Sequence, residues 1–224
     1  MPNIAFLKEA QQLASKFNAQ LVAVSKTRTN DEILTVYNQG QKVFGENKVQ
    51  DLTDKYNTLP KDIEWHMIGH LQTNKVKYIA PFVKLIHAVD SRKLLEEVNK
   101  RAKLCDRVID CLLQFHIAAE DSKFGFSIVE AEELLGNQEI NQLKNVRIIG
   151  VMGMATFTND KVQIAQEFKK LKHIFDVLRV QFFLKESYFK DISMGMSGDY
   201  DIALENGSTL IRIGSKIFGN RVYN

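Results

Sequence analysis

The sequence has few cysteines and no pattern that assembles them into a site. Cys105 and Cys111 are the only two in 224 residues, and neither belongs to a CxxC pair or a Cys/His spacing typical of metal sites. We therefore expect no bound metal and no disulfide framework. The first residues, MPNIAFLKEA, lack the basic and long apolar regions of a secretory signal. Together with two free thiols, this predicts a cytoplasmic protein.

Long apolar runs and a strong charge bias are also missing. The uninterrupted apolar runs span only a few residues, far short of the roughly 20 that a membrane helix needs. The net charge is +3, and both signs are interspersed along the helical stretches, so a nucleic-acid-binding face is not expected. The chain has three prolines and no linker rich in Pro, Gly or Ser. We therefore expect one domain over residues 1–224.

Strand-like apolar runs alternate with stretches of helical periodicity along the whole chain. The predicted strands are Leu21–Lys26, Val43–Glu46, Trp65–Ile68, Leu85–Val89, Val108–Ile117, Val146–Met154, Ile192–Gly195 and Leu210–Ile213. The predicted helices are Ile4–Phe17, Asp31–Gln39, Val49–Tyr56, Asn74–Ala80, Arg92–Leu104, Val129–Leu135, Val162–Val180 and Asp199–Glu205.

Strict alternation of strand and helix predicts parallel strands, and eight such units predict a (β/α)8 TIM barrel with an extra N-terminal helix. The alternative is an open doubly wound sheet, which usually carries a glycine-rich fingerprint after its first strand. Here that strand is followed by SKTRTND, which contains no glycine. The barrel is therefore favoured.

Active sites of such barrels lie at the C-terminal ends of the strands, where the first predicted strand delivers Lys26. Val22, Val24 and Lys26 alternate, so they point to one side of the strand. Burial disfavours a charged ammonium group and lowers its pKa, which makes the amine a nucleophile suited to Schiff-base chemistry. The alternative is that Lys26 ends the strand and extends its ammonium group into water.

Two segments after the seventh and eighth predicted strands have the features of an anion site. In SMGMSGDYD, Ser197 is a natural helix N-cap and Gly198 lets the backbone approach a ligand closely. In RIGS, Gly214 and Ser215 offer further N–H and hydroxyl donors. Ordinary helix capping explains either segment alone. Both segments lie in the two loops that frequently bind phosphate in barrels, and this location favours a phosphate-binding site.

Arg212 is predicted to point into the barrel mouth. It shares a strand face with Leu210 and Gly214, while Ile211 and Ile213 face the helices. A buried arginine needs a partner because it cannot release its proton. That partner is either a carboxylate such as Glu46 or an acceptor on a ligand.

Six motifs in this order resemble the YggS/PROSC family of pyridoxal 5′-phosphate (PLP) homeostasis proteins. They are AVSKTRT, VFGENKVQD, WHMIGHLQTNK, EDSKFGF, SMGMSGDYDIAL and IRIGSKIFGNR, and they cover nearly the whole chain. The resemblance implies the barrel found in alanine racemase, with PLP bound covalently to Lys26 as a Schiff base. Ser197, Gly198, Gly214 and Ser215 match phosphate-binding positions, and Arg212 matches the residue facing the pyridine nitrogen. Asn47 and His66 match polar positions near the cofactor.

Three further residues are expected near the cofactor, two from their place at strand ends and one from the family resemblance. Met152 and Ser193, at the ends of the sixth and seventh strands, are expected in the cofactor pocket, although Met152 is equally explained as a core residue. Phe124 stands where the family frequently has a small residue, which predicts a narrower rim of the cofactor pocket.

The resemblance implies a PLP carrier that acts in homeostasis and delivery, with apo PLP-dependent enzymes as partners and no catalytic turnover. Arginine only donates hydrogen bonds, so a facing pyridine nitrogen is unprotonated and a weak electron sink. The chain ends nine residues after Ser215, without the second domain of a racemase, so a monomer is expected. The alternatives are a PLP-dependent enzyme, such as a weak racemase or decarboxylase, and a cofactor-free Schiff-base aldolase.

Overall fold

The computed structural model describes residues 1–119 and 124–219, which form a closed barrel of eight parallel strands in sequence order. The barrel closes because β1 (Gln20–Val24) pairs with both β2 (Val43–Glu46) and β8 (Leu210–Ile213). The other strands are β3 (Glu64–Met67), β4 (Leu85–Val89), β5 (Ile109–Gln114), β6 (Val146–Met152) and β7 (Asp191–Ser193). The predicted barrel with an extra N-terminal helix is confirmed.

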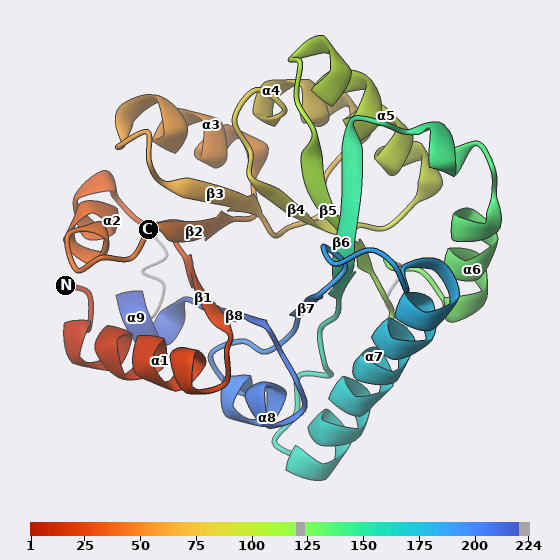
Figure 1. The fold of residues 1–224 in the computed structure, drawn as a ribbon. Helices are drawn as coiled ribbons and strands as arrows, with labels where there is room; N and C mark the ends of the chain where they lie inside the picture. The colour runs from red at the N-terminus through yellow and green to blue at the C-terminus, as the bar shows by residue number, and fades with distance from the viewer. Residues whose placement is uncertain (120–123, 220–224) are drawn as a thin grey trace.

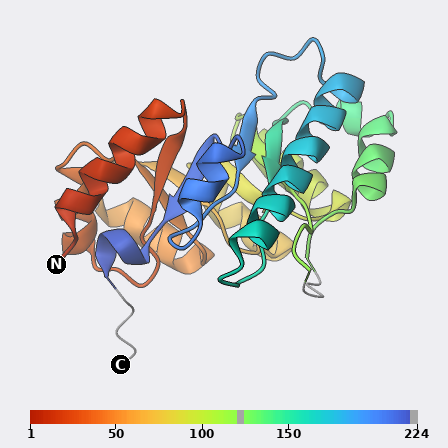
Figure 2. The same cartoon turned by 90° about the horizontal axis from the view of Figure 1, so that it is seen from below.

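Helices surround the barrel on its outside (Figure 1). They are α1 (Ile4–Lys16), α2 (Asn30–Tyr37), α3 (Val49–Thr58), α4 (Val76–Ile79), α5 (Arg92–Leu104), α6 (Ile128–Gly136), α7 (Lys161–Phe182), α8 (Tyr200–Glu205) and α9 (Ser215–Phe218), with 3-10 helices η1 (Thr73–Lys75) and η2 (Ile140–Gln142). Helix α1 lies beside β1 and close to α9, where Asn3 N–H donates to the Ile217 carbonyl at 2.7 Å (Figure 2).

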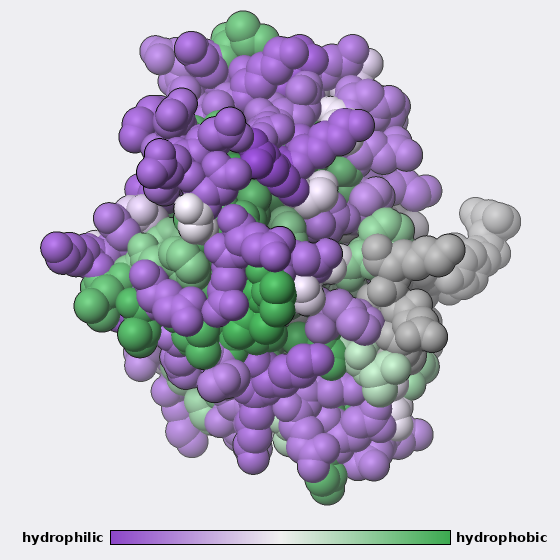
Figure 3. Space-filling model, turned by 90° about the vertical axis from the view of Figure 1, so that its right-hand side faces the viewer, coloured by the Kyte–Doolittle hydropathy of each residue, from purple (hydrophilic) through white to green (hydrophobic). Residues whose placement is uncertain are grey.

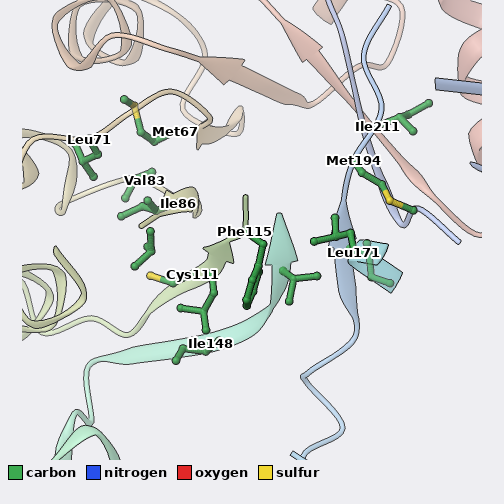
Figure 4. Packing of buried hydrophobic residues seen from close by; sticks show 14 of the residues in the cluster. Met67, Leu71, Val83, Ile86, Cys111, Phe115, Ile148, Leu171, Met194 and Ile211 are labelled. Carbon is green, nitrogen blue, oxygen red and sulfur yellow. The ribbon is translucent and has the colours of Figure 1, made fainter. Parts of the chain in front are cut away.

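The period of two along each strand divides the buried residues into two sets. Every second side chain along a strand points into the barrel. The inward side chains form a small interior cluster of Val22, Val43, Leu85, Leu112, Ile149, Met152 and Leu210. The alternate side chains pack against the helices, as Met67, Ile86, Cys111 and Ile211 do in Figure 4. Burial of each large apolar side chain in this outer layer contributes about 1.5–3 kcal/mol to the stability of the fold.

Side-chain caps fix where several helices begin after the strands. Thr29 accepts from the backbone N–H of Glu32, whose carboxylate accepts in return from the N–H of Thr29, so a capping box starts α2. Ser127 and Glu130 form the same arrangement at α6. The loops that lead to these helices therefore leave the barrel in defined directions.

The predicted elements differ from the structure mainly at the C-terminal ends of strands. Strand β1 ends at Val24, before Lys26, and β7 ends at Ser193 because Gly195 turns the chain with φ of 92°. Strands β5 and β6 also end earlier than predicted, and the predicted helix Asn74–Ala80 is η1 followed by α4. Helix α9 was not predicted. Residues 120–123 of the EDSKFGF motif and residues 220–221 of IRIGSKIFGNR lie outside the described residues.

The molecule is largely hydrophilic on the side drawn in Figure 3, where hydrophobic residues form a band near the middle. Within residues 1–119 and 124–219, no helix has the length and apolar character needed to cross a membrane.

Gly150 in β6 lies so close to β7 that a side chain cannot be accommodated. A Cβ atom there would be 1.8 Å from the Asp191 carbonyl oxygen. We expect Gly150→Ala to push the strands apart and lower the free energy of unfolding by about 2–3 kcal/mol, measured by urea denaturation. The matched control is Gly136→Ala in α6, where a Cβ atom meets nothing within 4 Å. Equal stability of the two variants would contradict this account of the β6–β7 contact.

Candidate functional site

A cavity of about 770 Å³ opens among residues at the C-terminal ends of the strands. Seven of the ten predicted site residues line it: Lys26, Asn47, Ser197, Gly198, Arg212, Gly214 and Ser215. The other three, His66, Met152 and Ser193, are buried and are not part of the lining.

Lys26 enters the cavity from a tight turn rather than from a strand. The Arg28 N–H donates to the Ser25 carbonyl at 3.0 Å, and Thr27 at the third position has φ of 64°. Lys26 is half-buried and lines the cavity together with Val24. The alternation predicted from the sequence therefore aims Lys26 at the same side as Val24, although the strand itself ends before it.

Glu46 faces the helices and is not a partner of Arg212. Because Phe44 and Glu46 share a face of β2, both point out of the barrel, where Glu46 accepts from Lys55 Nζ on α3 at 2.6 Å. Ser25 Oγ donates to the same carboxylate at 2.6 Å. Burial raises the pKa of Glu46.

Arg212 is buried, and its partners are neutral oxygens. It donates to Ser193 Oγ and, at 3.1 Å, to the Gly153 carbonyl, while the guanidinium also lines the cavity. Burial lowers the pKa of Arg212 to about 10, so it remains a cation at neutral pH. The prediction that Arg212 points into the barrel mouth agrees with this placement.

A chain of hydrogen bonds continues behind Arg212. His87 Nδ1 lies 2.8 Å from Ser193 Oγ, and His87 Nε2 lies 3.0 Å from His66 Nδ1. Ser193 and His66 thus lie beneath Arg212 rather than in the cavity wall. Met152 belongs to the interior cluster of the barrel, as its alternative interpretation predicted.

The two buried histidines predict how stability depends on pH. Burial lowers the pKa of His66 to about 3 and holds that of His87 well below its usual value. An unfolded imidazole takes up a proton as the pH falls through about 6.5, whereas these stay neutral in the folded protein. The unfolded state therefore binds more protons than the folded state. The contribution of the two histidines to the free energy of unfolding is complete above about pH 6.5 and is lost as the pH falls towards 3.

We expect His66→Gln to have a flatter stability profile than the wild type between these pH values. The measurement is urea denaturation at several pH values. Because Glu46 titrates in both proteins, the difference between the two profiles reports the histidine. Parallel profiles would show that His66 is protonated in the folded protein.

The two segments predicted to bind an anion meet through Ser197. Its hydroxyl oxygen accepts from the Gly214 N–H at 3.3 Å and so joins the loops that follow β7 and β8. The prediction that Ser197 caps the helix is wrong, because α8 begins at Tyr200 and Asp199 occupies the N-cap position. Asp199 accepts from the Met196 N–H, which orders the same loop.

Gly198 leaves space at this point of the wall. A Cβ atom on Gly198 would meet nothing within 4 Å, and its backbone does not need positive φ. The missing side chain is therefore not required by the fold. Ser197, Gly198 and Ser215 all line the cavity, and we call their hydroxyl and backbone amide groups the polar cradle.

Cationic side chains outnumber carboxylates around the cavity. Among its described lining residues, Lys26, Arg28, Arg212 and Lys216 are basic, and only Asp199 is acidic. Arg28 and Lys216 were not predicted as site residues. Their proximity to predicted site residues is visible in the sequence, since Arg28 is two residues from Lys26 and Lys216 follows Ser215 directly. The charge of the wall suits an anionic ligand.

Apolar side chains form the outer edge of the cavity. Phe157 is 98% exposed, and Phe124 lies with its ring centre 4.6 Å from that of His70. Both residues line the cavity, which places Phe124 where the sequence predicts a narrower rim; Phe157 was not predicted. Within the described residues, no group of three His, Cys, Asp or Glu side chains is placed to hold a metal ion.

Comparisons with known proteins identify the family and support the fold. The alanine racemase N-terminal domain family matches residues 5–222. A pyridoxal phosphate homeostasis protein of Aquifex aeolicus is 38% identical over 206 residues, which cover 92% of this chain and 88% of that protein. The structure of PipY from Synechococcus elongatus PCC7942 without PLP superposes with a TM-score of 0.85 at 31% identity, covering 95% of this chain and 99% of that one.

A second structure of PipY, with PLP bound, matches with a TM-score of 0.83 at 30% identity over the same shares of the two chains. Alanine racemase from Bartonella henselae, with covalently bound pyridoxal phosphate, has a TM-score of 0.65 at 12% identity. That match covers 95% of this chain and 58% of the racemase, and it shows similarity of the fold.

Proposed function

This chain belongs to the family of pyridoxal phosphate homeostasis proteins, and we propose that it binds PLP in the cavity described above through a Schiff base on Lys26. The observation that carries the proposal is the wall of the cavity, where an amine, a buried guanidinium and a polar cradle converge with an excess of basic side chains. When bound, PLP supplies an aldehyde that an amine can capture.

The polar cradle is the proposed seat of the phosphate. Ser197, Gly198, Gly214 and Ser215 lie on the two loops that Ser197 joins, and an anion there accepts from backbone amides and hydroxyls. Asn47 lies in the wall as a further polar group. His66, Ser193 and Met152 are not proposed to touch the cofactor, because they lie beneath the wall.

Lys26 is the proposed point of attachment. In its uncharged form, Nζ is a nucleophile that would hold the aldehyde of PLP as a Schiff base, with one C=N bond in place of the C=O bond and one water released. No oxidant or reductant would be needed. The reaction is reversible, as release to another protein requires.

Arg212 favours storage over catalysis. A guanidinium only donates hydrogen bonds, so a ring nitrogen facing it must accept and stay unprotonated. An unprotonated ring withdraws electrons weakly, and the carbanion chemistry of PLP enzymes depends on that withdrawal. We therefore propose a carrier without evident turnover that delivers PLP to apo PLP-dependent enzymes.

The proposed setting is the cytoplasm, and the proposed unit is one domain over residues 1–224. Cys105 and Cys111 are both free thiols, which is typical of a reducing compartment. The family match over residues 5–222 supports one continuous domain.

The test is a PLP titration followed by reduction with borohydride. We expect an imine absorption band and, after reduction, a stable adduct that peptide mass spectrometry locates on Lys26. An adduct on another residue, or none, would overturn the attachment. Sustained conversion of amino acids by the loaded protein, lost in Lys26→Ala, would favour the alternative of a PLP-dependent enzyme.

Gly198→Val tests the phosphate seat separately. Because a Cβ atom at Gly198 meets no protein atom within 4 Å, we expect stability to stay within about 0.5 kcal/mol of the wild type. The added isopropyl group would occupy the proposed position of the phosphate and weaken PLP binding by roughly tenfold or more. Pyridoxal, which lacks the phosphate, should bind both proteins similarly. An unchanged preference for PLP over pyridoxal would place the phosphate elsewhere.

A further inference from the structure

The turn that carries Lys26 has an unfavourable conformation for its sequence. Thr27 occupies the third position of the Ser25–Arg28 turn with φ of 64°, in the left-handed region. Glycine is favoured there, and a β-branched residue is strained. Such a conformation persists only where the surrounding structure enforces it. The contacts of Ser25, at the start of the turn, supply that constraint.

Ser25 is held at three atoms. Its N–H donates to the Gly45 carbonyl at 3.1 Å, and its hydroxyl donates to Glu46 at 2.6 Å. Its carbonyl accepts twice, from the Arg28 N–H at 3.0 Å and from Lys55 Nζ at 2.8 Å. We call the contacts of Glu46 and Lys55 with Ser25 the Ser25 clamp.

The Ser25 clamp is buried and lies on the helix side of the sheet. The side chain of Glu46 is fully buried and that of Lys55 is 9% exposed, and neither residue lines the cavity. A buried ion pair is a poor source of net stability, because desolvation offsets much of the attraction between the charges. Fixing a local geometry is a role in which such a pair is effective. Here the geometry is the turn that ends in the Lys26 amine.

We propose that Glu46 and Lys55 are positioning residues for Lys26. They hold Ser25 from the helix side of the sheet and keep Thr27 in the left-handed region. The turn thereby directs the Lys26 amine into the cavity. The inference rests on the proposed attachment of PLP to Lys26. Lys55 itself is not a competing nucleophile, because its ammonium group contacts Ser25 and Glu46 on the far side of the sheet.

The test separates capture of the aldehyde from binding of the ring and phosphate. Pyridoxine 5′-phosphate carries an alcohol in place of the aldehyde, so it can occupy the site without forming an imine. The variant is Glu46→Gln/Lys55→Met, which removes both charges together and leaves no unpaired buried ion. The matched control is Lys42→Met/Asp62→Asn, which removes an exposed ion pair with an N–O distance of 2.7 Å.

We expect the clamp variant to form the imine with PLP at least tenfold more slowly, while its affinity for pyridoxine 5′-phosphate stays within twofold of the wild type. The control should match the wild type in both measurements. An equal loss for both ligands would indicate a general structural defect, and no loss for either would show that the clamp is unnecessary. Both results overturn the inference. Absence of an imine in the wild type would instead overturn the proposed function.

A rescue experiment tests the strained turn directly. Thr27→Gly lets position 27 adopt positive φ without steric cost, so the turn no longer depends on the clamp. Adding Thr27→Gly to the clamp variant should restore most of the rate of imine formation. In the wild-type background the same substitution should change that rate by less than twofold. Failure of the rescue would show that the clamp acts on something other than this turn.

Discussion

Lys26→Ala is expected to eliminate the imine absorption band and the borohydride-stable adduct. The variant keeps the polar cradle and Arg212, so PLP still binds, but only as strongly as a ligand without an aldehyde. Loss of the covalent bond should weaken apparent PLP affinity by roughly a hundredfold, which corresponds to about 2.7 kcal/mol. Affinity for pyridoxine 5′-phosphate should be unchanged. Lys26 is half-buried at the cavity wall, so its truncation should alter stability little.

The control for Lys26→Ala is Lys216→Ala, because Lys216 is the other lysine among the described residues of the wall. Lys216 is exposed and lies over the rings of Phe6 and Tyr200, at 5.5 and 4.7 Å from their centres. We expect its variant to retain the imine band in full. A band that survives Lys26→Ala and disappears in Lys216→Ala would move the attachment to Lys216.

The barrel could be predicted because its signal repeats along the chain. Each apolar run is followed by a stretch of helical period, and only parallel strands accommodate that order. The ends of the strands could not be predicted in the same way. Strand β1 ends early because the Ser25–Arg28 turn, held by a lysine 30 residues away, draws the chain out of the sheet. Such contacts depend on tertiary structure and leave no local pattern.

Alternation along the strands predicts which side a residue faces but not its depth. It correctly aims Arg212 inwards, and the same rule applied to β2 places Glu46 outside with Phe44. His66 lies between the outward residues Trp65 and Met67, so it points inwards as required for a site residue. It nevertheless lies beneath the cavity, bonded to His87, because a period of two does not specify the height along the barrel axis.

The family resemblance contributed what the residues alone could not. An expected anion site and the inward arginine follow from spacing, but neither identifies a pyridine ring or an aldehyde. Arg28 and Lys216 line the cavity, but their position beside predicted site residues does not identify them, because a basic residue beside a motif is usually solvated. Their contribution becomes visible only when the loops converge around one cavity.

Arg212→Glu is expected to change the protonation state of the bound ring. A carboxylate in place of the guanidinium accepts a hydrogen bond and stabilises a protonated pyridine nitrogen, whereas Arg212 can only donate. The imine spectrum of the loaded variant should therefore shift towards the ring-protonated form. The measurement is the absorption spectrum of the loaded protein as a function of pH. A spectrum identical to that of the wild type would show that position 212 does not contact the ring.

The same substitution disrupts a buried network, which sets its cost in stability. Arg212 is 3% exposed and donates to Ser193 and to the Gly153 carbonyl, so a carboxylate there loses both bonds and is itself desolvated. We expect a loss of about 3–5 kcal/mol in the free energy of unfolding. Arg212→Lys keeps the charge and should preserve the unprotonated ring, at a cost of about 1–2 kcal/mol for the hydrogen bond it cannot make.

Arg212→Gln keeps the spectral test available if the glutamate variant does not fold. It removes the cation beside the ring nitrogen without adding an anion, so the ring should protonate at a higher pH than in the wild type and a lower pH than in Arg212→Glu. The expected order of the three proteins follows from the charge at position 212 alone. Any other order would show that the electronics of the bound ring are governed by a different residue, and the argument for a carrier would lose its physical basis.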